Sequence, residues 1–256
     1  MLIHEVDLGE LQSAYIVPFS DLHLGDPHFD RQKFLGYRDW VQSKPNAFVT
    51  LNGDIMNTAI KSSVSDIYSE TMNPRDCLKA AVSLFEPIKD KILCVVNGNH
   101  ERRIYKEAGF DISELLAQQL GVYYAGDEAY LKIKVGKATG TKGNGKPIVY
   151  TMYQTHGWGG GKTAGAKVNN LSYMANIVLA DIYIASHTHF MTTHTGEIGI
   201  PDIRTNKIVP TKLTFASSGA FLKRGGYAVT HGFTHAKLGS PRIRLDGTKK
   251  DVHVSI

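Results

Sequence analysis

Several short stretches of the chain alternate or accumulate apolar and β-branched residues, which is the pattern of half-buried and buried β-strands. Segments with a helical period separate several of them, so the order of elements indicates the α/β class. Beyond about residue 122 the strand patterns dominate, and a mixed sheet or two sheets packed face to face fits that half better than a parallel sheet. The predicted strands are AYIVPFS (14–20), AFVTLN (47–52), ILCVVN (92–97), LKIKV (131–135), PIVYTMYQT (147–155), DIYIAS (181–186) and KLTFASS (212–218).

Helix signals lie between these strands. Apolar residues recur with a helical period between residues 30 and 43. Asn73 followed by Pro74 predicts an N-cap with proline at the first helical position. Asp111 and Glu114 form a capping-box pattern ahead of LLAQQL. The basic, glycine-rich segment after residue 219 contains three short β-like pieces, which are YAVTH (227–231), PRIRL (241–245) and DVHVS (251–255).

Composition limits the class of protein and the cellular compartment that we expect. The 256 residues are 42% hydrophobic and 21% charged, which fits a single globular domain over residues 1–256. The chain lacks a membrane-span-like apolar run of about 18 residues. Its first ten residues show no signal-peptide pattern, and its two cysteines are too few for a disulfide framework, so we expect a cytoplasmic protein. A net charge of +5 suits an anionic partner.

The glycine run in THGWGGGKTAG (155–165) resembles a phosphate-binding loop, but its spacing argues against one. The P-loop motif requires a glycine, four further residues and then Gly-Lys-Ser/Thr. Counted back from Gly161, Lys162 and Thr163, that first glycine falls at His156. A histidine is a poor substitute at a strained turn that glycine normally forms, so we exclude a nucleotide-binding P-loop here.

Polar residues follow five of the predicted strands directly, and their types suit a metal centre. Ligands of open α/β sheets bind at the carboxyl ends of strands, so these residues are expected to converge. Each piece alone has a simpler explanation: Asp-x-His as a surface or capping pair, Gly-Asp as a turn, and a lone histidine as a hydrogen-bonded side chain. Oxygen and imidazole donors without thiolates, in five successive endings, favour divalent metals such as Mn, Fe or Zn. The endings are DLH (21–23), GD (53–54), GNHE (98–101), HG (156–157) and HTH (187–189).

This order of motifs resembles the calcineurin-like metallophosphoesterase superfamily, whose signature is D-x-H, G-D, G-N-H-E/D, H and G-H-x-H. The match spans residues 21–189. Ser186 departs from the glycine that usually opens the last block, and we expect so small a residue to be tolerated. The resemblance implies a four-layer sandwich of two mixed β-sheets flanked by helices.

The resemblance also implies a set of site residues. Asp54 would bridge two divalent metal ions, with manganese favoured and iron, zinc, nickel or magnesium as alternatives. His100 would be the catalytic histidine beside the metals, and Arg103 and Lys162 are candidates for binding the substrate phosphate. For Arg103 a surface position or a structural ion pair is the simpler alternative, and the same alternative applies to Lys162. The implied metal ligands are Asp21, His23, Asp54 and His189 for the first ion and Asp54, Asn99, His156 and His187 for the second.

The implied reaction is hydrolysis of a phosphate ester by a hydroxide that bridges the two metals, with His100 as general acid. Protein phosphatases of this superfamily carry G-D-x-x-D-R-G at the second block. Here Asn57 and Thr58 replace the last aspartate and arginine, which argues against a phosphoprotein substrate and leaves open what orients His100.

We therefore predict a phosphodiesterase acting on nucleic acid or nucleotides. The alternatives are a phosphomonoesterase or protein phosphatase, or a non-catalytic scaffold of the same fold, although every expected ligand is retained. A basic carboxyl-terminal third could follow a nucleic-acid backbone, or it could be a solvated rim. Its basic residues are Lys223, Arg224, Arg242, Arg244, Lys249 and Lys250.

Overall fold

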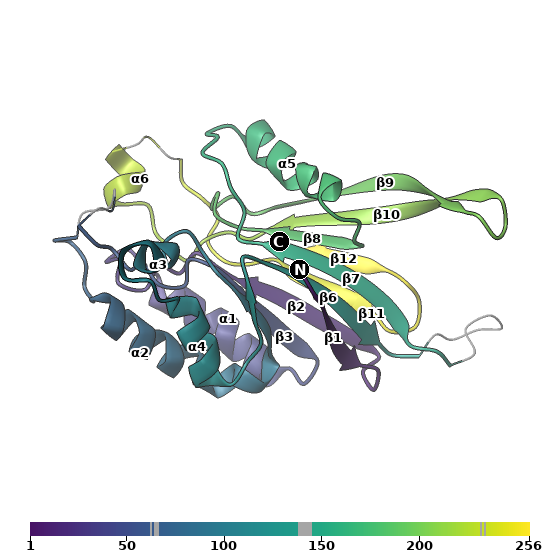
Figure 1. Ribbon diagram of the computed structural model, residues 1–256, viewed down its shortest axis with the longest axis horizontal. Coiled ribbons are helices and arrows are strands. Elements are labelled where there is room, and N and C mark those ends of the chain that lie inside the picture. Colours follow the sequence, from purple (N-terminus) through teal and green to yellow (C-terminus); the bar gives the residue numbers. More distant parts are fainter. Residues whose placement is uncertain (62, 64–66, 138–144, 231, 233) are drawn as a thin grey trace.

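The computed structural model describes residues 1–61, 63, 67–137, 145–230, 232 and 234–256. Within them, two six-stranded mixed sheets pack face to face with helices on their outer faces, as Figure 1 shows. This confirms the predicted four-layer sandwich. Sheet A has the order β1 (Ile3–Leu8), β6 (Glu128–Val135), β7 (Ile148–Thr155), β8 (Ile182–Ala185), β10 (Lys207–Ser217) and β9 (Thr192–Asp202). Sheet B has the order β12 (Val252–Ser255), β11 (Arg242–Asp246), β2 (Ser13–Phe19), β3 (Ala47–Asn52), β4 (Ile92–Val96) and β5 (Tyr124–Gly126).

Most helices cover sheet B. Helices α1 (Arg31–Ser43), α2 (Pro74–Phe85) and α4 (Ile112–Leu120) pack on its outer face, and α3 (Arg102–Ala108) contacts α4. Helix α5 (Ala164–Tyr173) covers sheet A. Short 3-10 turns, η1 (Glu86–Lys91) and η2 (Met174–Asn176), follow α2 and α5. No helix among these described residues is both long and apolar enough to cross a membrane.

Local signals placed the helix starts correctly. The side chain of Asn73 accepts a hydrogen bond from the backbone of Asp76 at the start of α2. Asp111 caps α4 by accepting from the backbone nitrogens of Ser113 and Glu114. These contacts satisfy backbone donors that the first helical turn leaves without partners.

One predicted strand is wrong, and three strands, β1, β5 and β9, were not predicted. Residues Gly226–Thr230 form helix α6, whose first turn is closed by a hydrogen bond from Ala228 N to Gly225 O, and His231 lies outside the described residues. The tendency of YAVTH to form a strand depends on a neighbouring strand, and none of the strand pairings among the described residues includes Gly226–Thr230. Strand β5 has only three residues, β1 buries only Val6, and β9 buries none of its residues, so the apolar pattern of a core strand is absent from all three.

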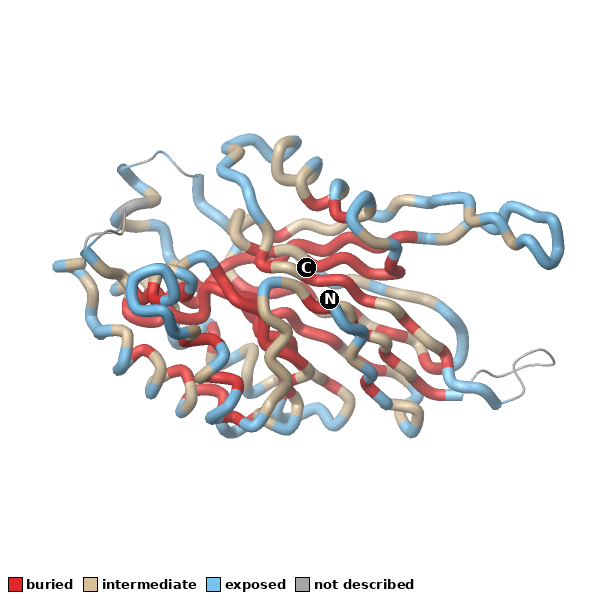
Figure 2. Tube along the Cα trace, in the orientation of Figure 1, coloured by how far each residue is buried: buried red, intermediate tan, exposed pale blue. Residues whose placement is uncertain are grey.

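Three apolar clusters hold the layers together, and Figure 2 shows them as buried segments inside the sandwich. One lies between sheet B and its helices, one between the two sheets, and one beneath α5. Strands β2, β3 and β4 are parallel, as are β7 and β8. Their carboxyl ends meet at one edge of the sandwich, beside α3, whereas the long β9–β10 hairpin extends from the opposite side in Figure 1.

Candidate metal centre

The loops after β2 and β8 bring three predicted ligands together, and we call Asp21, His23 and His189 the first donor group. His189 Nε2 lies 3.1 Å from Asp21 Oδ1 and 3.2 Å from His23 Nε2. Asp21 Oδ2 accepts hydrogen bonds from Ser20 Oγ (2.8 Å) and from the backbone nitrogen of His187 (3.2 Å). Asp21 Oδ1 is buried and its close neighbour is His189 Nε2, so a carboxylate oxygen and an imidazole nitrogen face the same point, as two ligands of one cation would.

The loops after β3, β4, β7 and β8 form the second donor group, which contains Asp54, Asn99, His156 and His187. Asn99 Oδ1 lies 3.0 Å from His156 Nε2 and 2.8 Å from His187 Nδ1. His156 Nε2 is 3.2 Å from Asp54 Oδ2. The structure therefore brings all seven predicted ligands to one edge of the two sheets.

Asp54 lies between the two groups. Its Oδ1 accepts a hydrogen bond of 2.9 Å from the backbone nitrogen of His100. Its Oδ2 is 3.2 Å from His156 Nε2 in the second group and 4.0 Å from His23 Nε2 in the first. Of the seven side chains, this carboxylate is therefore the one placed to serve two cations at once.

The arrangement of these atoms suits a bound divalent cation better than direct hydrogen bonds among the side chains. The Nδ1 of His156 is 2.8 Å from the backbone oxygen of Asn52 and donates its proton there, so in the neutral ring Nε2 carries a lone pair. That lone pair faces two acceptor oxygens, on Asp54 and Asn99. Three acceptors directed at one point require a proton or a cation between them. Carboxylate, amide and imidazole donors together are typical of sites for Mn, Fe or Zn.

Backbone conformation marks the same residues. Five of the seven predicted ligands have a positive φ, a region that non-glycine residues seldom occupy and that costs about 1–3 kcal/mol each. Such strain persists only where the surroundings enforce it, and it clusters at functional sites. The five are Asp21 (52°), His23 (51°), Asp54 (50°), His187 (65°) and His189 (52°).

Two glycines and a buried glutamate enforce the strained loop at Asp54. A Cβ on Gly98 would collide with the backbone nitrogen and carboxylate of Asp54, and one on Gly53 would lie 2.7 Å from Gly98 Cα. Glu101 accepts from the backbone nitrogens of Asp54 (3.0 Å) and Met56 (2.8 Å). Sequence analysis placed Glu101 within the GNHE motif but gave it no role, because this contact crosses between two loops.

Burial and mutual charge shift the titration of these groups. Burial alone would raise the pKa of Asp21, but His189 and His156 outweigh it and hold that pKa at about 2. Burial would likewise lower the pKa of His156, yet the Asp54 and Asp21 carboxylates raise it to about 10. Burial and repulsion by Asp54 raise the pKa of Glu101 to about 8. A metal ion would compete with the proton on His156 for the same lone pair.

Asn57 orients His100. Its Oδ1 lies 2.7 Å from His100 Nδ1 and 3.2 Å from His23 Nδ1, so one amide oxygen accepts from both rings. Sequence analysis left this role open because asparagine replaces the expected aspartate, but an amide oxygen accepts a hydrogen bond as a carboxylate does. His100 Nε2 is 3.1 Å from Arg103 Nη2 and 3.7 Å from Asp54 Oδ2.

His100 is therefore held as a neutral ring, with Nε2 directed toward the two donor groups. Burial lowers its pKa to about 3, and the positive charge of Arg103 contributes to this against the opposing effect of Asp54. Arg103, one of the two predicted phosphate-binding residues, thus lies in contact with the predicted catalytic histidine.

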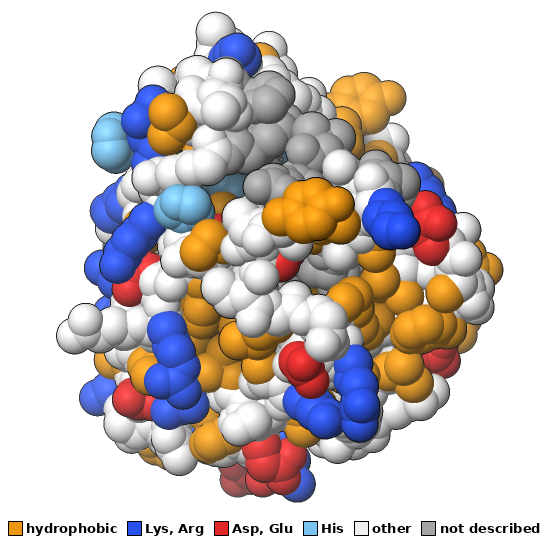
Figure 3. Space-filling model, turned by 90° about the vertical axis from the view of Figure 1, so that its left-hand side faces the viewer, with side chains coloured by type: hydrophobic (Ala, Val, Ile, Leu, Met, Phe, Trp, Pro, Cys, Tyr) orange, Lys and Arg blue, Asp and Glu red, His pale blue; other side chains and the backbone are white. Residues whose placement is uncertain are grey.

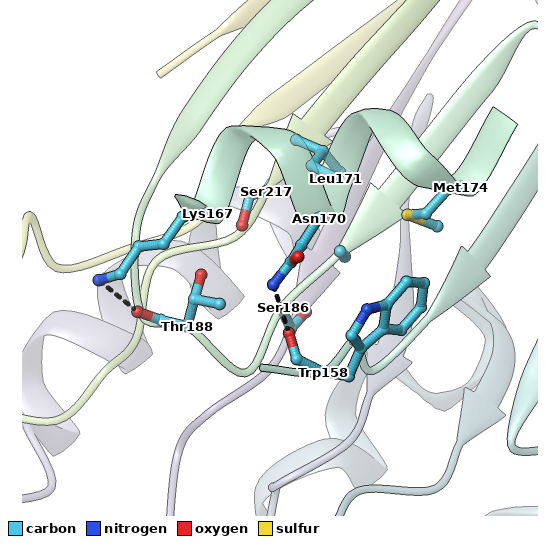
Figure 4. Close-up of a pocket in the computed structure, with 10 residues that line it drawn as sticks. Trp158, Lys167, Asn170, Leu171, Met174, Ser186, Thr188 and Ser217 are labelled. Carbon is cyan, nitrogen blue, oxygen red and sulfur yellow. Dashed lines mark hydrogen bonds between the residues drawn. The ribbon is translucent and has the colours of Figure 1, made fainter. Parts of the chain in front are cut away.

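The other predicted phosphate-binding residue, Lys162, is exposed in the loop before α5 and stays a prediction. The structure draws attention to Lys167 instead, which sequence analysis missed. Lys167 Nζ donates to Thr188 O at 3.1 Å, between the two histidines of the HTH motif, as Figure 4 shows. Asn170 Nδ2 donates to Trp158 O at 3.3 Å in the loop after His156. Helix α5 thus braces both histidine-bearing loops.

Three basic residues of the carboxyl-terminal third contact three different partners. Lys250 pairs with Asp181 at 2.7 Å, at the amino end of β8 and hence far from the HTH motif at its other end. Lys223 pairs with Asp30 at 3.2 Å, and Arg242 stacks on Trp40 with 4.2 Å between the guanidinium carbon and the ring centre. On the face shown in Figure 3, lysines and arginines are interspersed with acidic and hydrophobic side chains.

No protein-family model matches the chain, and no curated protein matches it in sequence. Its fold is similar to that of several solved structures. A metallophosphoesterase from Sphaerobacter thermophilus is 13% identical, with 91% of this chain and 83% of that chain covered and a TM-score of 0.40. The calcineurin-like phosphoesterase YfkN from Bacillus subtilis is 11% identical, with 95% of this chain and 88% of that chain covered and a TM-score of 0.38. Wild-type Vps29 from Entamoeba histolytica, complexed with zinc, is 12% identical, with 94% of this chain and 97% of that chain covered and a TM-score of 0.42.

The chain has two mixed sheets of six strands each among its described residues, and its polar motifs follow the ends of β2, β3, β4, β7 and β8. In the order of these motifs and in its sandwich architecture, the chain resembles the calcineurin-like metallophosphoesterases.

Proposed function

We propose that this protein is a metal-dependent phosphoesterase with two divalent cations at the carboxyl ends of its strands. The observation that supports this best is the position of Asp54 Oδ2 between two groups of carboxylate, amide and imidazole donor atoms. Asp21, His23, Asp54 and His189 would hold one cation, and Asp54, Asn99, His156 and His187 the other. Manganese is the favoured ion, with iron, zinc, nickel or magnesium as alternatives.

Two such cations would polarise the phosphoryl oxygens and lower the pKa of a bound water toward neutrality. The chain's own residues supply the rest of the chemistry. Arg103 would turn from His100 Nε2 to a phosphate oxygen, for which a guanidinium is well suited. That movement removes a positive charge from the ring and brings a negative one close to it, and both changes raise the pKa of His100. A proton on His100 Nε2 can then pass to the oxygen of the leaving group.

For the substrate, we propose a phosphodiester in nucleotides or nucleic acid. The net charge of +5 supports an anionic substrate, and Asn57 and Thr58 stand where protein phosphatases of the superfamily have aspartate and arginine. Because Lys223, Arg242 and Lys250 are dispersed and engaged with other residues, a nucleotide or a short strand is favoured over a long duplex.

The test is hydrolysis of bis-p-nitrophenyl phosphate and p-nitrophenyl phosphate by the intact protein with Mn²⁺, with His100→Asn as the catalytic control. We expect the diester to be hydrolysed faster and the variant to be about 10²–10⁴-fold slower on both esters. Hydrolysis of the monoester alone would identify a phosphomonoesterase. Two bound Mn²⁺ ions without turnover of either ester would identify a non-catalytic scaffold. Wild-type protein that binds no Mn²⁺ would overturn the proposed centre.

A further inference from the structure

Asn52 is the last residue of β3 and precedes Gly53 and Asp54, but it is not part of the metallophosphoesterase motif. Its relative exposure is 0%, and it lies where sheet B faces sheet A. A fully buried amide at this point is unexpected, because most residues between the two sheets are apolar. Its contacts explain why a polar residue is present.

The side chain of Asn52 reaches across to sheet A. Its Nδ2 donates to the backbone oxygen of Thr155 at 2.9 Å and to Ser186 Oγ at 2.7 Å. Thr155 directly precedes His156, and Ser186 directly precedes His187. One amide group therefore binds the two residues that immediately precede the histidines of the second donor group in the chain.

The backbone of Asn52 acts on the same group. Its carbonyl oxygen lies 2.8 Å from His156 Nδ1 and accepts that proton, which leaves Nε2 as the donor atom that faces Asp54. Ser20 Oγ lies 2.9 Å from the same carbonyl and 2.8 Å from Asp21 Oδ2, so its single proton is shared between these two acceptors. Asn52 thus connects with the loops of Asp21, Asp54, His156 and His187.

The orientation of the amide is fixed by its partners. The oxygen of Thr155 can only accept, so the amide nitrogen of Asn52 must face it. The amide oxygen then has no hydrogen-bond partner among the described residues, a cost that a purely structural position would be expected to avoid. An apolar side chain of the same size would avoid that cost but would lose both contacts with sheet A.

Ser186 completes the arrangement and accounts for its departure from glycine. Its hydroxyl accepts from Asn52 Nδ2 and from Ser218 Oγ (2.8 Å), and its backbone nitrogen donates to His156 O at 2.9 Å. A glycine at this position would keep the backbone bond and remove the acceptor for both side chains.

We propose that Asn52, through Ser186, is a positioning residue that holds the two histidines of the second donor group at the correct distance from Asp54. The inference rests on the proposed function, because it assigns Asn52 to the same metal centre. Side chains that orient metal ligands typically contribute about 10–100-fold in metal affinity. We expect an effect of that size on the second ion and little effect on the first.

The experiment is a calorimetric titration of full-length Asn52→Leu with Mn²⁺, followed by electron paramagnetic resonance of the loaded protein. Leucine has a similar size and removes both donors. We expect the second ion to bind about 10–100-fold more weakly, with the spectrum of an isolated ion replacing that of a coupled pair. The matched control is Thr50→Val on the same strand, because Thr50 is equally buried and its Oγ1 has no hydrogen-bond partner in the described part of the chain.

Ser186→Ala is the second variant, in case Asn52→Leu fails to fold, and it should weaken the second ion about 10-fold. Two ions bound to the wild type, with unchanged affinities in Asn52→Leu and Ser186→Ala, would overturn this inference alone. Equal weakening in Thr50→Val would also overturn it, since the effect would then be general destabilisation. Wild-type protein that takes up fewer than two ions would overturn the proposed centre and this inference together.

Discussion

The two sheets contribute unlike halves to the candidate metal centre. Sheet B supplies the carboxylates, and Asp21 and Asp54 are 0% and 1% exposed, with one oxygen of each held by neighbouring donors. Sheet A supplies only imidazoles, and the side chain of His189 is 32% exposed. The Asp54 loop is held by Glu101 of the same sheet, whereas the imidazole half depends on bracing by α5 and by Asn52 of the opposite sheet.

This difference indicates how such a centre can be both charged and stable. A buried carboxylate is costly unless hydrogen bonds and cations compensate it, so its loop must be rigid. An imidazole that binds a metal is neutral and carries no such cost, so it can occupy the more exposed side of the centre, as His189 does. The following changes would break or sharpen this contrast.

The largest effect is expected from Asp54→Asn, which removes the one negative charge between the two donor groups. We expect the affinity for both Mn²⁺ ions to fall more than about 100-fold, beyond what loss of an outer contact causes. Calorimetry would measure it, with Asp26→Asn as the control, since Asp26 bonds His28 outside the donor groups. Retention of either ion at wild-type affinity would contradict the central position of Asp54.

His100→Asn should separate turnover from metal binding. We expect kcat to fall about 10²–10⁴-fold, the usual contribution of a general acid, while two ions stay bound. Asn57→Ala should reproduce part of this loss, because it removes the acceptor that orients the ring. Loss of a metal ion from His100→Asn would instead make His100 a ligand, which its 3.7 Å distance from Asp54 Oδ2 allows.

Gly98→Ala should test the rigidity of the carboxylate half. The added methyl group meets the backbone of Asp54, which cannot move without disturbing Glu101. We expect destabilisation by about 3 kcal/mol, measured by denaturant unfolding. Gly36→Ala is the matched control, because an added Cβ in α1 meets nothing within 4 Å and should stabilise by about 0.5–1 kcal/mol. Equal effects would show that the loop is not tightly packed.

A smaller effect is expected from pH on protein stripped of metal by a chelator. The pKa of His156 is raised to about 10, above the ordinary 6.5, so its contribution to stability is complete below pH 6.5 and is lost as the pH rises toward 10. We expect Tm to fall by at least about 2–4 °C over that window, the equivalent of about 1 kcal/mol. Saturating Mn²⁺ or His156→Gln should abolish this slope, and its persistence in the variant would assign it to another group.

Sequence reasoning located the centre because its residues follow strands with clear apolar patterns. Asp21, Asp54 and His156 each come directly after such a strand, and parallel strands end at the same edge. The structure brings them together, while their roles as ligands stay predictions. The starts of α2 and α4 were also legible, because Asn73 and Asp111 act on residues only two or three positions away.

The residue roles that could not be predicted from the sequence depend on contacts between residues far apart in the chain. Asn57 was regarded as a lost aspartate, and only the structure shows that its oxygen faces His100. Glu101 and Asn52 act across loops and sheets, with no local pattern to identify them. Lys250 was grouped with other basic residues by proximity in sequence, yet it pairs with Asp181 on the other sheet.

The β9–β10 hairpin has a consequence for self-association. Strand β10 pairs with β8 only along Thr214–Ser217, so the outer part of the hairpin lacks a third strand among the described residues. Two open edges next to exposed Ile203 and Ile208 would normally invite strand addition by another molecule. Pro201 and Pro210 lie within this outer part and offer no amide hydrogen, so each side of the projecting ribbon is interrupted as a template for cross-β growth.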